Sequence, residues 1–402
     1  MKHINKSTQC IHNDKFDTKF QNMQMVMSPI YQGSTVLYND IDAFFNYCRK
    51  GINSVEDLAP FPEYGRIGNP TTYEFSKAMD SLEGSDYTLV TNGGMSAIFY
   101  SIISFLKSGD HLLVSDGLYS STRKIIENIL PRYNIEYSYY DSLTVGDLES
   151  KVKKNTKAIF FEFCASGTFE IEDIDGIVNL AKEKNLVTIC DNTMMTPFLQ
   201  NLMDFGIDVV AHSCTKFVIG HCDAMLGTVS VKKKHFKELY DFATISGNHA
   251  NSNAVYLALR GLKTLGLRVS DSVRRGYVVM NEIANHRVID RILHPYFNKD
   301  EVQQERLAKY TTGDVVGLFS IVLKKKYTNE QLKVFFDELK IIKIGLSWGG
   351  FESLCIPYSL AHRVGVAKKF NDQTVMRIYI GMEDEKDVID DILVALDKLS
   401  EL

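Results

Sequence analysis

The sequence predicts an α/β protein with a mainly parallel seven-stranded sheet, helices on both faces of that sheet, and a smaller C-terminal α+β domain. Between residues 87 and 231, short apolar segments alternate with segments of helical period such as "IVNLAKEKN" at 177–185. This alternation favours parallel strands joined by helices that cover the sheet. The seven predicted strands are "YTLVT" 87–91, "HLLVS" 111–115, "IEYSYY" 135–140, "AIFFEF" 158–163, "LVTIC" 186–190, "DVVAHS" 208–213 and "LGTVSV" 226–231.

The segments before and after this sheet differ from it. The N-terminal part has weak periodicity and many turn formers, as in "MSPIYQGST", which predicts an irregular arm. After "LALRGLKTLGLR" at 257–268, a long helical region precedes three predicted strands, "VVGLFSIVL", "KIIKIGLS" and "VMRIYIGM", and an amphipathic last helix at 387–399. We therefore divide the chain into an arm at 1–64, a large domain at 65–264 and a small domain at 265–402.

Composition excludes several classes of function. Of the 402 residues, 45% are hydrophobic and 24% charged, as in ordinary globular enzymes, and the net charge of −5 argues against a nucleic-acid binder. The longest apolar run, "AIFYSIISFL", is about half of a membrane span, and the start "MKHINKSTQC" is too polar for a secretory signal. Seven cysteines without a framework spacing suit a reducing compartment. We expect a soluble cytoplasmic protein without nucleic-acid or membrane partners.

The segment "HSCTKFVIGHCD" at 212–223 allows three interpretations: a metal site, the end of a strand with incidental polar residues, or the surroundings of a catalytic lysine. His212, Cys214, His221 and Cys222 are possible zinc ligands, but their spacing matches no zinc finger or ribbon. Adjacent side chains on extended backbone also point apart. We expect no metal here.

The catalytic interpretation depends on two strand ends. Asp191 comes at the end of one apolar strand, and Lys216 comes just past the end of another. In an open α/β sheet, ligands bind beyond the carboxyl ends of the strands. A lysine that forms a Schiff base and a carboxylate that keeps a pyridine nitrogen protonated are what pyridoxal phosphate (PLP) chemistry needs.

The sequence also predicts a phosphate-binding site. In "LVTNGGMSAIFYSII" at 89–103, a strand is followed by Gly93 and Gly94 and then by an apolar helix, whose N-terminus would offer N–H groups to a phosphate. Ser213 and Thr215 could donate hydroxyl hydrogen bonds to the same group. The glycine-opened helix, the carboxylate and the lysine together predict a PLP enzyme.

Seven motifs along residues 29 to 383 point to one family. They are "EYGRIGNPTTYEFSKAMDSLEG", "NGGMSA", "DNTMMTP", "HSCTKFVIGHCD", "RGLKTLGLR", "SWGGFES" and "MRIYIGME". In this order they resemble the motifs of the Cys/Met-metabolism PLP enzymes. This is a fold-type I family with cystathionine β- and γ-lyases, cystathionine γ-synthase and methionine γ-lyase.

The resemblance implies a role for each matching residue. Lys216 corresponds to the Schiff-base lysine and Asp191 to the partner of the pyridine nitrogen, while Tyr119 corresponds to the tyrosine stacked on the cofactor ring. The positions that would hold the phosphate are Gly94, Met95, Ser213, Thr215 and, from a neighbouring subunit, Tyr64 and Arg66. A shared site of this kind implies a homo-oligomer, commonly a tetramer built from dimers.

The substrate side is implied in the same way. Arg377, a charged residue within an apolar strand, corresponds to the cation that binds the substrate carboxylate. Ser347 and Trp348 begin "SWGGFES", the form that this segment takes in β-lyases, whereas γ-lyases usually have S-L-G-x-x-E-S. The methionine γ-lyase pattern Y-G-C-T is absent, since Tyr119 is followed by Ser-Ser-Thr.

The chain departs from the family pattern at one segment near the cofactor. Where the family has E-S-P followed by small polar residues, this sequence has "EFCASGTFE", with Phe163 and Cys164 in place of Ser-Pro. Ser166 keeps a polar group near the place of the cofactor's phenolic oxygen. "NGG" also replaces the usual S-S-G. These departures affect the expected specificity.

The resemblance therefore predicts a PLP-dependent carbon–sulfur β-lyase. Such an enzyme cleaves L-cystathionine to homocysteine, pyruvate and ammonia, in methionine biosynthesis. The alternatives within PLP chemistry are a cystathionine γ-lyase or γ-synthase, a methionine γ-lyase, and an alanine racemase as main or side activity. The alternatives outside it are a structural zinc-binding module and a catalytically silent scaffold.

Overall fold

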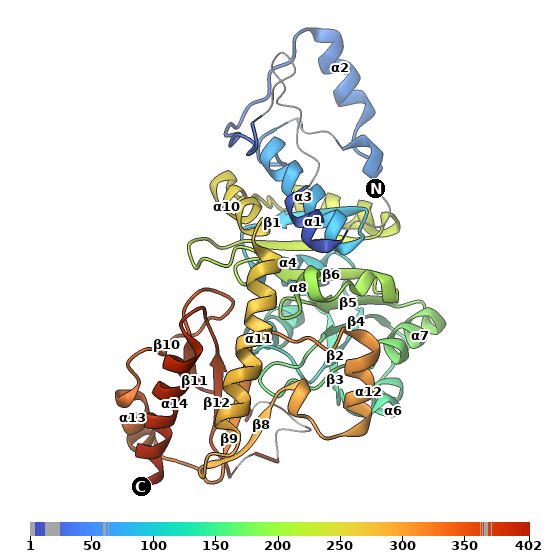
Figure 1. Cartoon of the computed structure of the whole chain (residues 1–402). Coiled ribbons are helices and arrows are strands. Elements are labelled where there is room, and N and C mark those ends of the chain that lie inside the picture. Colours follow the sequence, from blue (N-terminus) through green and yellow to red (C-terminus); the bar gives the residue numbers. More distant parts are fainter. Residues whose placement is uncertain are drawn as a thin grey trace.

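The chain folds around two separate β-sheets, a seven-stranded one and a five-stranded one (Figure 1). None of the helices in the described ranges is both long and apolar enough to cross a membrane. The computed structural model describes residues 5–12, 25–58, 62, 64–361, 363, 365, 369–370 and 372–402.

The predicted seven-stranded, mainly parallel sheet is confirmed. Its strands lie in the order β1-β7-β6-β5-β4-β2-β3, with β7 antiparallel to β1 and β6 and the other four pairs parallel. The strands are β1 (Tyr87–Thr91), β2 (His111–Ser115), β3 (Glu136–Tyr140), β4 (Thr156–Glu162), β5 (Val187–Asp191), β6 (Val209–Ser213) and β7 (Gly227–Val231). All strands except β7 therefore end at the same edge of the sheet.

Helices cover both faces of this sheet, as predicted. Alternate strand residues point to opposite faces, so Ile159 and Phe161 of β4 enter one apolar core while Ala158 and Phe160 enter another. The first core is completed by α3 (Pro70–Glu83), α7 (Ile174–Lys184), α10 (Ser252–Leu262) and the first half of α11 (Leu265–Ile283). The second core is completed by α4 (Gly94–Ile103), α5 (Ser120–Asn128) and α9 (Phe236–Ile245).

The smaller C-terminal sheet has the strand order β10-β11-β12-β9-β8. Its strands are β8 (Ile289–Leu293), β9 (Leu318–Leu323), β10 (Lys343–Ile344), β11 (Leu354–Pro357) and β12 (Val375–Tyr379). The sequence predicted β9, β10 and β12 but missed β8 and β11, because segments as short as "IDRIL" and "LCIP" give little periodic signal. This sheet packs against α13 (Asn329–Glu338) and the predicted last helix, α14 (Glu385–Ser400).

Helix α11 joins the two sheets (Figure 1). Its first residues, Leu265 and Val269, are buried in the core of the large sheet. Its last turns bury Val279, Met280 and Ile283 in the core of the small sheet. One helix therefore fixes the position of the small sheet against the large one.

The N-terminal arm is more regular than predicted. It contains α1 (Lys6–Ile11) and α2 (Ile41–Lys50), so the prediction of a wholly irregular arm was wrong. The Asp40 carboxylate accepts a hydrogen bond from Ala43 N at 2.7 Å, which caps the first turn of α2, and Gly51 follows its last turn. In Figure 1, α2 stands away from the rest of the chain. The other helices are α6 (Val145–Ser150), α8 (Thr196–Leu199) and α12 (Glu301–Tyr310).

Candidate active site

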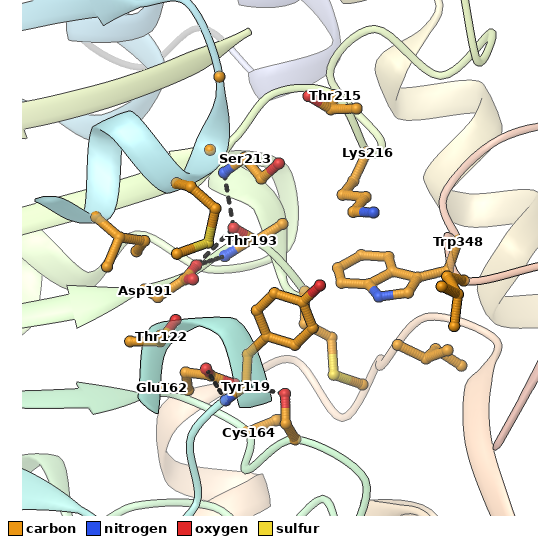
Figure 2. A pocket seen from close by; sticks show the side chains of 18 of the residues that line it. Tyr119, Thr122, Glu162, Cys164, Asp191, Thr193, Ser213, Thr215, Lys216 and Trp348 are labelled. Carbon is orange, nitrogen blue, oxygen red and sulfur yellow. Dashed lines mark hydrogen bonds between the residues drawn. The ribbon is translucent and has the colours of Figure 1, made fainter. Parts of the chain in front are cut away.

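A cavity of about 480 Å³ lies at the carboxyl edge of the large sheet, where the small sheet approaches it. Most of the predicted site residues meet there (Figure 2). Those that line the cavity are Gly94, Met95, Tyr119, Asp191, Ser213, Thr215, Lys216, Trp348 and Arg377.

Lys216 lies three residues beyond the end of β6, in a turn in which its N–H donates to Ser213 O at 3.1 Å. Its Nζ donates to Ser347 Oγ at 2.8 Å and lies 5.2 Å from the centroid of the Trp348 ring. Burial, and after it the positive charge of Arg377, lower the pKa of Lys216 to about 8. The amine is therefore partly neutral near pH 8, which is the form that attacks an aldehyde.

Asp191 ends β5 and faces the same cavity as Lys216 (Figure 2). Its Oδ1 accepts hydrogen bonds from Thr193 N at 2.9 Å and Thr193 Oγ1 at 2.5 Å. Thr193 Oγ1 in turn accepts from Ser213 N at 2.8 Å, which ties the ends of β5 and β6 together. Burial raises the pKa of Asp191, because the charged carboxylate loses solvation there, and a cationic group brought into the cavity would offset that loss.

The predicted phosphate cradle is a close approach between α4 and the end of β6. A Cβ on Gly94 would lie 2.4 Å from Ser213 Oγ and 3.1 Å from Ser213 Cα, so this position has no room for a side chain. Gly94 and Met95 are the first two residues of α4, whose N–H groups have no helical partner. The Thr215 hydroxyl donates to Leu226 O at 3.2 Å, and this bond holds the turn that carries the lysine.

Tyr119 lies at the N-terminus of α5 and is held by a residue that the sequence did not single out. Its N–H donates to Glu162 Oε1 at 2.6 Å, and Ser166 Oγ donates to Glu162 Oε2 at 2.8 Å. Burial raises the pKa of Glu162, and the charge of Asp191 raises it further. A lone acidic residue within the apolar strand 158–163 was the signal that could have identified it. Thr193 was missed too, although it lies two residues after Asp191.

Arg377 comes to the cavity from β12 of the small sheet and is 7% exposed. One guanidinium nitrogen donates to Ser347 O at 3.4 Å, and the guanidinium carbon lies 5.6 Å from the centroid of the Tyr358 ring. Ser347 therefore contacts both cations, through its hydroxyl to Lys216 and through its carbonyl to Arg377. Ser347 is not among the residues that line the cavity, but it touches both of these cations.

Two predicted residues do not reach the cavity of their own chain. Tyr64 is 45% exposed and pairs with Thr35 in an isolated bridge, and Arg66 donates to Thr244 O at 2.5 Å. Their predicted role concerns a neighbouring subunit, and it stays a prediction.

The four possible zinc ligands are not gathered around one point. His212 is buried and bonded to Glu83, Cys214 lies 3.5 Å from the Thr228 hydroxyl, and His221 is bonded to Ile219 O. Among the residues that the structure describes, no three His, Cys, Asp or Glu side chains are placed to hold a metal ion.

The residues around the cavity fit PLP. An amine and a carboxylate face one space, a helix N-terminus is approached closely enough to require Gly94, and the Ser213 hydroxyl lies beside it. These groups match the aldehyde, the pyridine nitrogen and the phosphate of the cofactor.

Residues 7–397 match the family model described as Cys/Met metabolism PLP-dependent enzyme. The chain belongs to this family. Its members depend on PLP, so PLP is the cofactor of this chain. The chain is therefore an enzyme of a family that includes lyases. The family resemblance in the sequence is thereby confirmed.

The relatives carry several different activities. The chain is 34% identical to the L-alanine/L-glutamate racemase of Wolbachia pipientis wMel, with 96% of each chain covered, and 30% identical to the cystathionine β-lyase of Escherichia coli K12, with 91% and 92% covered. It is similar to a crystal structure from Campylobacter jejuni described as a candidate O-acetylhomoserine (thiol)-lyase, with a TM-score of 0.86, 25% identity and 98% and 100% coverage. That structure contains a pyridoxyl-lysine monophosphate residue.

Proposed function

We propose that this enzyme is a carbon–sulfur β-lyase that cleaves L-cystathionine to homocysteine, pyruvate and ammonia in methionine biosynthesis. The observation that carries the proposal is that Lys216 and Arg377 both contact the Ser347-Trp348 segment beside the cavity. An α-amino acid needs a base near its Cα and a cation for its carboxylate. The β-lyase form of the "SWGG" segment and the cystathionine β-lyase relatives support the choice of reaction.

The proposed cofactor contacts follow the geometry of the large-sheet edge. Asp191 pairs with the pyridine nitrogen, and the Tyr119 ring lies against the cofactor ring. The phosphate is held by Gly94, Met95, Ser213 and Thr215. Across a subunit interface, Tyr64 and Arg66 complete the phosphate site. The enzyme is therefore a homotetramer built from dimers, and the two subunits of each dimer share their active sites. We place the enzyme in the cytoplasm.

The proposed reaction breaks the Cα–H and Cβ–S bonds of the substrate by elimination and then its Cα–N bond by hydrolysis. When bound, PLP withdraws electrons from the substrate Cα. Arg377 binds the carboxylate, and the neutral Lys216 amine removes the Cα proton, a step that a placed base accelerates by about 10²–10⁴-fold. The electron pair of the Cα–H bond forms a Cα=Cβ bond, and the sulfur leaves Cβ with its bonding pair and takes up a proton. Addition of water then gives pyruvate and ammonia.

The neighbours of Lys216 suit this step. Because burial and Arg377 lower its pKa to about 8, a useful fraction of the amine is neutral near physiological pH. The Ser347 hydroxyl, 2.8 Å away, keeps Nζ directed into the cavity. The Trp348 ring covers one side of the amine, which limits access of water.

Product analysis with L-cystathionine tests the proposal. A β-lyase gives pyruvate and homocysteine, whereas a γ-lyase gives 2-oxobutyrate and cysteine. The two oxoacids are separated by chromatography after derivatisation, with heat-treated enzyme as the control. Formation of 2-oxobutyrate and cysteine as the main products would overturn the choice of β-elimination.

Racemisation of alanine is a second candidate. The relative with 34% identity is named an L-alanine/L-glutamate racemase, and Tyr119 and Lys216 approach one cavity from different elements. One group could remove the Cα proton while the other returns a proton to the opposite side. Incubation with L-alanine, followed by chiral chromatography, measures this activity. D-alanine formed faster than pyruvate is formed from cystathionine would make racemisation the main activity.

A further inference from the structure

The segment that departs from the family pattern forms one wall of the cavity together with a segment of the small domain. The first segment, 164–170, follows β4, and the second, which includes Tyr358 and Arg363, follows β11. Cys164, Ser166, Gly167 and Phe169 of the first line the cavity, and so does Tyr358 of the second.

Gly167 and Tyr358 fit one another. Gly167 has a φ of +82°, a conformation that side chains with a Cβ rarely adopt. A Cβ placed there would lie 2.2 Å from Cε1, 2.8 Å from Cδ1 and 3.0 Å from Cζ of the Tyr358 ring. The ring therefore lies directly on the glycine, and a larger residue would displace it.

Tyr358 also approaches the guanidinium of Arg377. Its N–H donates to Val375 O at 2.8 Å, and Ile356 pairs with Arg377 in the β11–β12 ladder. The pairing of these two strands therefore fixes the backbone positions of both Tyr358 and Arg377. The guanidinium carbon lies 5.6 Å from the ring centroid, within the range of a cation–π interaction. Among the described residues, no carboxylate lies within ion-pair distance of Arg377. The charge is thus buried, held by a ring and a carbonyl, and available to a carboxylate from outside.

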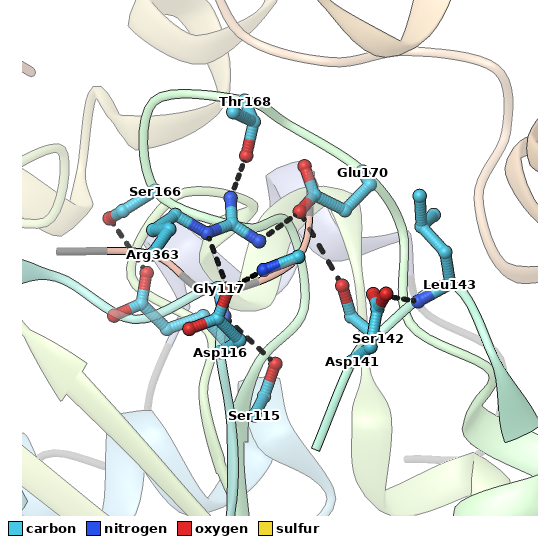
Figure 3. A network of polar contacts seen from close by, with 12 residues as sticks. Ser115, Asp116, Gly117, Asp141, Ser142, Leu143, Ser166, Thr168, Glu170 and Arg363 are labelled. Carbon is cyan, nitrogen blue, oxygen red and sulfur yellow. Dashed lines mark hydrogen bonds and ion pairs between the residues drawn. The ribbon is translucent and has the colours of Figure 1, made fainter. Parts of the chain in front are cut away.

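Buried ion pairs fix the segment that carries Tyr358 to the large domain. The Arg363 side chain is fully buried; its Nε donates to Asp116 Oδ2 at 3.3 Å, and its two terminal nitrogens are bonded to Thr168 and Glu170 (Figure 3). Thr168 is the residue after Gly167. The two segments are therefore joined at adjacent points, by ring packing at 167 and by Arg363 at 168 and 170.

We propose that Tyr358 is a positioning residue that holds the Arg377 guanidinium in place for the substrate carboxylate, and that Gly167 is a glycine because this ring occupies its side-chain space. The proposal rests on the proposed role of Arg377 and deepens it.

The test compares the binding of glycine and of methylamine, which lacks the carboxylate, to the holoenzyme. Binding is followed by the change in visible absorbance, without turnover of a substrate. We expect Tyr358→Leu to weaken glycine binding by about 5- to 30-fold, as loss of a desolvated cation–π contact implies, with methylamine binding unchanged. Tyr358→Phe keeps the ring and should bind glycine like the parent enzyme. Tyr133→Leu, at a tyrosine that is 53% exposed, is the matched control.

Equal weakening of glycine and methylamine in Tyr358→Leu would show a merely structural role and overturn the proposal, as would unchanged glycine binding. Gly167→Ala provides a second test, since its Cβ would displace the ring and weaken glycine binding selectively. In the double variant Gly167→Ala/Tyr358→Leu, the losses should not add, because both act through the ring; additive losses would contradict the proposal. Failure of the β-lyase assay leaves these binding outcomes unaffected, so the two proposals fail separately.

Discussion

The two halves of the cavity are built in different ways. The cofactor half consists of residues at or just beyond the ends of β1, β2, β5 and β6, which all belong to one sheet held by backbone hydrogen bonds. The substrate half consists of Arg377 and Tyr358, which the β11–β12 pairing of the small sheet holds together, and Gly167 of the large domain, which meets them only through the Tyr358 ring. The cofactor half is therefore set by the sheet, whereas the substrate half also depends on how the two domains pack.

The largest effect is expected from Lys216→Ala in the cofactor half. It removes the amine that we propose as the Schiff-base group and as the base that takes the Cα proton, so activity should fall by at least about 10²–10⁴-fold. The visible absorbance of the lysine-bound cofactor should disappear as well. Lys233→Ala, at an exposed lysine, is the control. A variant that kept the absorbance would contradict the assignment of position 216.

Arg377→Met in the substrate half should cost less. Losing one partner of a buried, hydrogen-bonded charge pair costs about 2–5 kcal/mol, so kcat/KM should fall by about 10²-fold, mainly through KM. The absorbance of the bound cofactor should remain, which separates the two halves experimentally. Arg291→Met, at an arginine with a 59% exposed side chain, is the control. Loss of the cofactor from this variant would show that the halves are not independent.

Gly94→Ala should have a smaller effect, again on the cofactor half. The added Cβ would lie 2.4 Å from Ser213 Oγ, and overpacking of this kind costs about 1–3 kcal/mol. We expect the Kd for PLP, measured by absorbance after removal and return of the cofactor, to rise by about 5- to 150-fold. Gly146→Ala, where a Cβ meets nothing within 4 Å, should leave the Kd unchanged. An unchanged Kd in Gly94→Ala would place the phosphate elsewhere.

The smallest effect is a shift in pH dependence that connects the halves. The rate at which the apoenzyme takes up PLP should rise with pH and level off above about 8, where Lys216 becomes neutral. Arg377 lowers that pKa by repulsion, so Arg377→Met should move the midpoint to higher pH. Burial is the larger cause, so the shift should be modest. A shift to lower pH would contradict the sign of this interaction.

How much could be predicted from the sequence differed between the halves. Lys216, Asp191 and Ser213 follow apolar strands that were recognisable by themselves, so their meeting at one edge followed from the parallel sheet. Glu162 and Thr193 were missed although they lie on or beside the same strands, because a single polar residue gives no periodic signal.

The substrate half could not be predicted beyond Arg377. Tyr358 is more than 190 residues from Gly167 in the chain, and β11, which precedes it, was too short to predict. Nor does a sequence pattern indicate that Arg363 is buried between Asp116 and Glu170. Such contacts depend on the packing of two domains, so the local hydrophobic periodicity of the sequence does not indicate them.

The sequence by itself determined the layered sheet and the cofactor and singled out Lys216 as the proposed Schiff-base residue, because apolar periodicity and strand-end chemistry act over a few neighbouring residues. Only the tertiary structure decided which ring lies against Arg377 and why position 167 holds a glycine. The reason is physical: a side chain's partners across a domain boundary are chosen by shape and charge once the cores have formed, when residues far apart in the chain first come within a few ångströms of each other.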